Sequence, residues 1–209
     1  MDSVTLIGTV TLVHLLALIS PGPDFLMCVR NSLTYSRKTG MWTAVGFGLG
    51  IAVHIFYSLA GLTVLISQSI LFFNAIKLLG AAYLIYIGIQ SLRSKSAAAF
   101  TETPQKKDDI SALSALKIGF LTNVLNPKAT LFFLSLFTLV LSPDTPGYIM
   151  GVVSVIMVVN TILWFSLVAF FITQDHLRRV FGRFQHVFNK TLSGLLIGLG
   201  IKVALTTNK

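Results

Sequence analysis

The sequence is poor in charged residues and nearly free of cysteine. Only 11% of its 209 residues are Asp, Glu, Lys or Arg, whereas a soluble domain carries about 25%. Hydrophobic residues make up 54%, and the mean hydropathy is +0.81. A soluble globular domain could not cover its surface with so few charges, and the same composition excludes disordered, collagen-like and coiled-coil chains. The single cysteine, Cys28, excludes an intramolecular disulfide and any Cys-x-x-Cys redox or zinc motif.

Six long apolar runs predict six transmembrane helices, because the hydrocarbon core of a bilayer is about 30 Å thick and needs about 20 apolar residues per helix. The runs are continuous and longer than the roughly 10-residue alternating strands of a membrane β-barrel. We therefore expect an all-α integral membrane protein. The predicted spans cover residues 4–29, 41–66, 70–92, 118–141, 148–173 and 191–205.

Lysine and arginine are concentrated in alternate connections between these spans. Most of the 16 basic residues lie between spans one and two, three and four, or five and six, and the two other connections have none. The positive-inside rule places the basic connections in the cytoplasm and both termini on the outer side of the membrane. The net charge of +9 therefore reflects topology and attraction to anionic lipids. The sequence lacks the pattern of clustered basic and aromatic residues that is typical of a nucleic-acid-binding surface, so we expect no nucleic-acid partner.

A polar linker, residues 94–113, divides the predicted spans into two groups of three. We expect residues 1–93 to form the first three-helix repeat and residues 114–209 the second. Since each half has an odd number of spans, the second enters the membrane upside down relative to the first, which gives a 3+3 inverted-topology repeat. Within the second half, residues 175–190 place apolar side chains at helical spacing beside arginines, which predicts an amphipathic helix on the cytoplasmic membrane surface.

The first span of each half is predicted to break at proline. The matching segments are Pro21-Gly22-Pro23-Asp24 and Asn126-Pro127-Lys128. Proline removes a backbone donor and clashes with the preceding helical turn, and the freed backbone groups cannot face lipid. They can line a cavity and bind polar groups there, so paired breaks in two inverted halves point to the substrate site of a transporter. A plain proline kink, satisfied by neighbouring helices, is the structural alternative.

Each break carries a charge. Asp24 is the only acidic residue in any predicted span, and Lys128 occupies the corresponding position of the second half. A lone charge at the bilayer centre costs roughly 3 kcal/mol, which pairing of these two would relieve. One interpretation is a structural ion pair. The other is a coupling site in which Asp24 takes a substrate ammonium or a proton, while Lys128 and the amides after Pro127 bind a carboxylate.

Other polar and small residues within the spans complete the candidate site. Gly46 and Gly50 form a small-xxx-small pair, which favours close helix packing or, alternatively, close approach of the backbone to a ligand. His14 and His54 either hydrogen-bond between helices or relay protons. The candidate substrate-binding or coupling residues are Asp24, Lys128, Pro21, Gly22, Pro23, Asn123, Asn126, Pro127, Gly46, Gly50, His54 and Asn160. The sequence shows no metal-binding cluster and no HExxH or GxSxG motif, so we expect no metal, no cofactor and no enzymatic activity.

Taken in order, these elements resemble the lysine exporter and homoserine/threonine exporter family. The resemblance covers essentially the whole chain and rests most on Pro-Gly-Pro at residues 21–23 and Asn-Pro-Lys-Ala at residues 126–129. It implies a multi-pass carrier of the bacterial inner membrane that exports amino acids on the proton gradient and forms homo-oligomers. The homoserine/threonine branch is the nearest, which favours a small neutral amino acid as substrate. A uniporter or a channel-like membrane protein for small polar solutes is the alternative.

Overall fold

The computed structural model describes residues 2–20, 22–68, 106–140 and 145–174, together with single residues and pairs between 78 and 93 and between 190 and 205. Every regular element in these segments is a helix, in agreement with the all-α prediction. The helices are α1 (Ser3–Ile19), α2 (Pro23–Thr34), α3 (Arg37–Gln68), α5 (Ala112–Val124), α6 (Pro127–Val140) and α7 (Gly147–Ile172).

Two of these helices are long and apolar enough to cross a membrane on their own. They are the Arg37–Gly61 stretch of α3 and the whole of α7, with 25 and 26 residues. α1 and α2 form a third candidate span as a pair bent by 57°. The second and fifth predicted spans correspond to α3 and α7. The third and sixth predicted spans and the amphipathic segment at 175–190 lie largely outside the described residues.

The first predicted break is present, and proline chemistry explains where α2 begins. α1 ends at Ile19, and α2 has Pro23 as its first residue. At this position the missing N–H of proline leaves no intrahelical hydrogen bond unmade. The N-cap is Gly22, so no side-chain hydrogen bond caps the first turn of α2.

The second predicted break is also present, and it is closed differently. α5 ends at Val124 and α6 begins at Pro127, with Asn126 immediately before it. The Oδ1 atom of Asn126 accepts a hydrogen bond from the Lys128 N–H at 3.0 Å, which caps α6. α5 starts at Ala112, six residues before the predicted span, because the Ser111 hydroxyl caps it by accepting from the Ser114 N–H.

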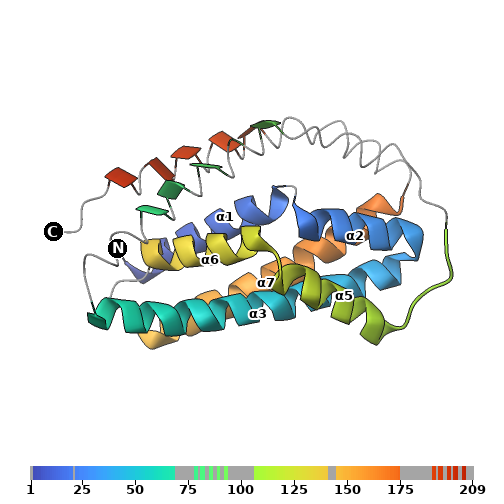
Figure 1. Ribbon diagram of the computed structural model, residues 1–209, viewed down its shortest axis with the longest axis horizontal. Helices are drawn as coiled ribbons and strands as arrows, with labels where there is room; N and C mark the ends of the chain where they lie inside the picture. The colour runs from blue at the N-terminus through green and yellow to red at the C-terminus, as the bar shows by residue number, and fades with distance from the viewer. Residues whose placement is uncertain are drawn as a thin grey trace.

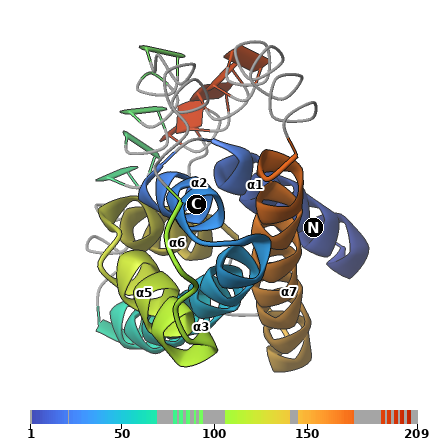
Figure 2. The same cartoon turned by 90° about the vertical axis from the view of Figure 1, so that its right-hand side faces the viewer.

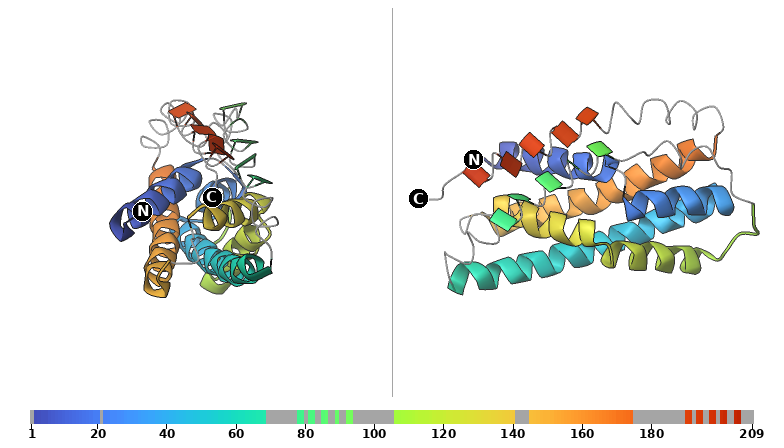
Figure 3. Two further views of the ribbon diagram at one scale, coloured as in Figure 1. Left: turned by 90° about the vertical axis from the view of Figure 1, so that its left-hand side faces the viewer. Right: turned by 45° about the horizontal axis from the view of Figure 1, so that its top comes forward.

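The two broken helices run antiparallel along the long axis of the molecule (Figure 1). α1 and α2 pass from the end that holds the N-terminus to the opposite end, and α5 and α6 return. α1 packs against α6, and α2 packs against α5. The breaks therefore meet near mid-length, with α7 running beside them (Figure 3). An end-on view places α3 between α5 and α7 (Figure 2).

Two apolar clusters fill the bundle, one on each side of the breaks. The first joins α1 and α6 to α3 and α7 and includes Val13 and Phe133. The second joins α2 to other parts of α3 and α7 and includes Phe25 and Phe47. The apolar core is thus interrupted at mid-length, where polar side chains lie beside the helix breaks.

α3 and α5 approach each other to backbone contact. A Cβ added at Gly46 would lie 2.2 Å from the carbonyl oxygen of Leu116, and one added at Gly119 would lie 2.1 Å from that of Thr43. Only glycine fits at such a crossing. The role of Gly46 is therefore close helix packing, which sets the position of α5 along α3.

The end of the linker is fixed to the turn between α2 and α3. The Lys107 N–H donates to the Thr34 carbonyl at 2.7 Å. The Asp109 carboxylate accepts from the hydroxyls of Ser36 and Thr39 at 2.8 and 3.0 Å. These bonds set the position from which α5 enters the bundle.

Candidate functional site

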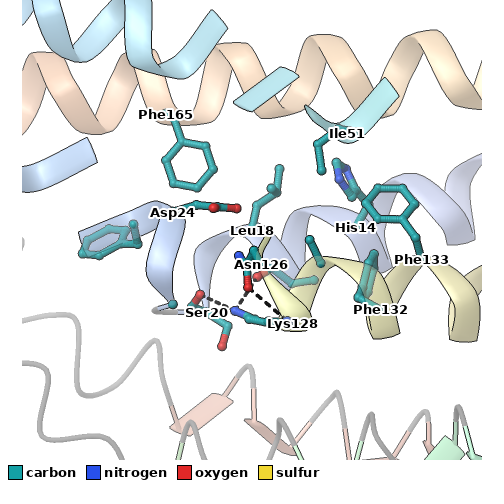
Figure 4. A pocket seen from close by; sticks show the side chains of 14 residues that line it. His14, Leu18, Ser20, Asp24, Ile51, Asn126, Lys128, Phe132, Phe133 and Phe165 are labelled. Carbon is teal, nitrogen blue, oxygen red and sulfur yellow. Dashed lines mark hydrogen bonds between the residues drawn. The ribbon is translucent and has the colours of Figure 1, made fainter. Parts of the chain in front are cut away.

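A small cavity lies where the two breaks meet (Figure 4). Its volume of about 40 Å³ holds a few water molecules, at about 10–15 Å³ each, and is too small for an amino acid. In the described conformation, a substrate therefore does not fit at the site. The polar side chains that line the cavity are His14, Ser20, Asp24, Asn126 and Lys128.

Asp24 reaches the cavity from the first turn of α2 and is bound by the other broken helix. Its Oδ2 atom accepts a hydrogen bond from the Nδ2 of Asn123 at 2.7 Å. Its Oδ1 atom is buried and has no hydrogen-bond partner among the described residues. The N-terminal end of the α2 dipole favours the charged carboxylate. Asp24 therefore has one oxygen held by the protein and one free to bind a proton or a cation.

Lys128 reaches across to the C-terminal end of α1. Its Nζ donates to the carbonyl oxygen of Ser20 at 2.6 Å and to that of Ala17 at 3.2 Å. Carbonyls in the last turn of a helix lack intrahelical partners and form the negative end of its dipole, so they stabilise a cation. A Cβ added at Gly22 would lie 3.1 Å from the Cδ of Lys128, so glycine at the break leaves room for this side chain.

Asp24 and Lys128 therefore share one cavity without being hydrogen-bonded to each other. Asp24 binds Asn123 on α5, and Lys128 binds the carbonyls of α1. The arrangement differs from the direct ion pair considered as one interpretation of the sequence. Each charge is thus bound by the other broken helix: backbone carbonyls at the end of α1 bind Lys128, and the Asn123 side chain of α5 binds Asp24.

A second layer of contacts holds Asn123 in place. The His54 Nε2 atom lies 2.9 Å from the Asn123 carbonyl oxygen, and its Nδ1 atom lies 2.5 Å from the Tyr57 hydroxyl. Since a carbonyl only accepts, Nε2 carries the proton and Nδ1 accepts from the tyrosine. Gly50 faces the same asparagine, where an added Cβ would lie 2.5 Å from Oδ1. His54 and Gly50 thus contact Asn123, whose hydrogen bond to Asp24 connects them to the cavity.

The remaining predicted residues divide into those at the breaks and those elsewhere. Pro23 and Pro127 each begin a helix at a break. Asn160 lies on α7 and does not line the cavity, and its Nδ2 is buried without a partner among the described residues. Pro21 lies outside the described residues.

His14 lines the cavity, although it is not among the candidate site residues chosen from the sequence. Both ring nitrogens are buried and have no hydrogen-bond partner among the described residues. Its ring faces Phe132 and Phe133, at centroid distances of 6.1 and 5.8 Å. In the sequence, only the position of His14 in the apolar run before the first break points to such a role. Tertiary contacts are needed to show that it lines the cavity.

Comparison with known proteins defines the class. The model of the LysE type translocator family matches residues 15–207. The threonine efflux protein of Escherichia coli strain K12 is 32% identical over 95% of this chain and 97% of its own length. The threonine efflux protein of Salmonella typhi is 31% identical over the same shares. A Bacillus subtilis relative known as the uncharacterized membrane protein YrhP is 29% identical over 90% of this chain and 93% of its own. No solved structure matches the chain.

The chain belongs to the LysE type translocator family. It is accordingly a membrane translocator and not an enzyme. This agrees with the resemblance drawn from the proline segments.

Proposed function

We propose that the protein exports small neutral amino acids, threonine and homoserine being favoured, from the cytoplasm in exchange for protons. The observation that carries the proposal is the meeting of two antiparallel helix breaks at a small cavity lined by both an anion and a cation. The names of the relatives in Escherichia coli and Salmonella typhi support threonine as the first substrate to test.

The cavity offers complementary groups to an amino-acid zwitterion. The free Oδ1 atom of Asp24 suits the substrate ammonium, and the ammonium of Lys128 suits its carboxylate. The ammonium of Lys128 rests on the α1 carbonyls before substrate binds. A substrate carboxylate attracts this ammonium, so binding weakens the contact that joins α1 to α6.

Proton coupling is assigned to Asp24. In the unloaded carrier its carboxylate takes a proton from the outer side, and it gives up that proton on the cytoplasmic side before binding the next substrate ammonium. A zwitterion that leaves while one proton enters moves one net charge per cycle. This is worth about 2.3 kcal/mol per 100 mV, or roughly fifty-fold in concentration.

Alternating access is assigned to the two halves of the chain. Residues 1–93 and 114–209 form inverted three-helix repeats in the bacterial inner membrane, with the linker in the cytoplasm and both termini outside. The antiparallel course of the broken helices supports this assignment. The small volume of the cavity supports a carrier over an open channel, because an amino acid fits there only if the helices around it move.

The proposal is tested with purified protein in liposomes loaded with labelled threonine. Acidifying the outer solution is expected to accelerate efflux, and a protonophore is expected to remove the acceleration. Efflux no faster than from protein-free liposomes would refute amino-acid export. Efflux at the same rate with and without the gradient would refute antiport and favour a uniporter.

A further inference from the structure

His14 is a polar group without a partner inside the proposed substrate cavity. Its side chain is 1% exposed, and neither ring nitrogen is hydrogen-bonded among the described residues. Burial of an unbonded polar group costs free energy, and this one lines the cavity beside the rings of Phe132 and Phe133 (Figure 4). A water molecule or part of a ligand is the natural partner for such a group.

The cavity has a charged end and an apolar end, and His14 lies at the apolar one. Ala17, whose carbonyl holds the Lys128 ammonium, follows His14 by three residues on α1. This corresponds to a rise of about 4.5 Å along the helix. Around His14 the lining is formed by Ile51, Phe132 and Phe133. An amino acid with its charged groups among Asp24 and the helix ends would extend a short side chain toward the imidazole.

We infer that His14 recognises a hydroxyl group on the side chain of the substrate. This inference rests on the proposed export of small amino acids and adds the residue that selects among them. A neutral imidazole offers one donor and one acceptor, and a hydroxyl offers both in return. Before substrate binds, water takes this place, and the hydroxyl replaces it on binding. The aromatic neighbours exclude other water, so a methyl group in place of the hydroxyl leaves His14 unbonded.

Such a site discriminates against substrates that lack the hydroxyl. A pocket built to hydrogen-bond a hydroxyl rejects the analogue without it far more strongly than an apolar pocket rejects an added hydroxyl. Valine is the matched competitor for threonine, because it replaces the hydroxyl with a methyl group of similar size. We expect wild-type protein to transport threonine with a kcat/KM at least about tenfold above that of valine.

The test compares the two substrates in liposomes containing wild-type protein, His14→Leu or His14→Gln. His14→Leu is expected to bring the threonine-to-valine ratio of kcat/KM close to one, and size-exclusion chromatography in detergent checks its folding separately. His14→Gln keeps a donor and an acceptor and is expected to retain preference for threonine. Ser58→Ala is the matched control, since the Ser58 hydroxyl is buried and unbonded among the described residues but does not line the cavity. Its ratio should equal that of the wild type.

Each other result overturns a distinct claim. An unchanged ratio in His14→Leu, or an equal fractional loss for both substrates, would overturn hydroxyl recognition and indicate a structural or proton-relay role. Equal transport of threonine and valine by the wild type would overturn it even if the leucine variant failed to fold. Absence of transport of any amino acid by the wild type would instead refute the proposed function itself.

Discussion

Replacing Gly50 by alanine tests whether the position of Asn123 controls transport. An added Cβ would lie 2.5, 2.8 and 2.9 Å from the Oδ1, Cβ and Cγ atoms of Asn123, where ordinary contacts begin at 3.4 Å. The Asn123 side chain must therefore move by several tenths of an ångström or more. Rotation of the side chain moves its Oδ1 and Cγ atoms but not its Cβ, so the backbone of α5 near Asn123 must shift as well. We expect this movement to break its 2.7 Å hydrogen bond to Asp24.

The size of the effect follows from that hydrogen bond. A buried group left unbonded costs about 1–3 kcal/mol, which corresponds to a change of roughly 5- to 150-fold in the populations it governs. We expect Gly50→Ala to slow threonine efflux from liposomes by a factor in this range. Its melting temperature in detergent should fall as well, because rotation of the Asn123 side chain cannot relieve the 2.8 Å contact with its Cβ.

Gly151→Ala provides the matched control for Gly50→Ala. Gly151 lies within α7, and an added Cβ there meets nothing within 4 Å among the described residues. The control removes a helical glycine without a clash, so it should transport threonine at the wild-type rate. A Gly50→Ala protein with wild-type efflux would show that the hydrogen bond between Asn123 and Asp24 is not needed for transport.

Three further substitutions probe the breaks, the helix crossing and the linker. Asp24→Asn should abolish threonine efflux while leaving an inserted, monodisperse protein, because it removes the only acid in the predicted spans; full transport by this variant would remove Asp24 from the coupling step. Gly46→Ala should lower stability by about 1–3 kcal/mol, measured by thermal unfolding in detergent, because its Cβ would meet the Leu116 carbonyl at 2.2 Å; a wild-type melting temperature would contradict the backbone contact. Asp109→Ala removes two bonds to hydroxyl groups and should lower stability by about 1 kcal/mol without changing the KM for threonine; an altered KM would mean that the linker contact reaches the site.

The sequence alone determined the membrane character, the helical class and the positions of both breaks. A chain with few charges and long apolar runs is stable only when lipid surrounds it. Proline interrupts a helix in any tertiary context, because it lacks the backbone donor. Pro23 and Pro127 accordingly begin helices in the structure. Asp24 and Lys128 could be identified as candidate functional residues because a charged residue in a membrane span is costly and therefore usually has a function.

Only the tertiary structure decided which group each of these charges binds. Lys128 rests on carbonyls at the end of α1, and Asp24 is held by Asn123. The role of His14 as a cavity residue depends on α6, which places Phe132 and Phe133 beside it. The physical reason is that the partners come from helices far apart in the chain. Residue patterns report what one helix does to its own backbone, whereas hydrogen-bond partners and cavities depend on how several helices pack against one another.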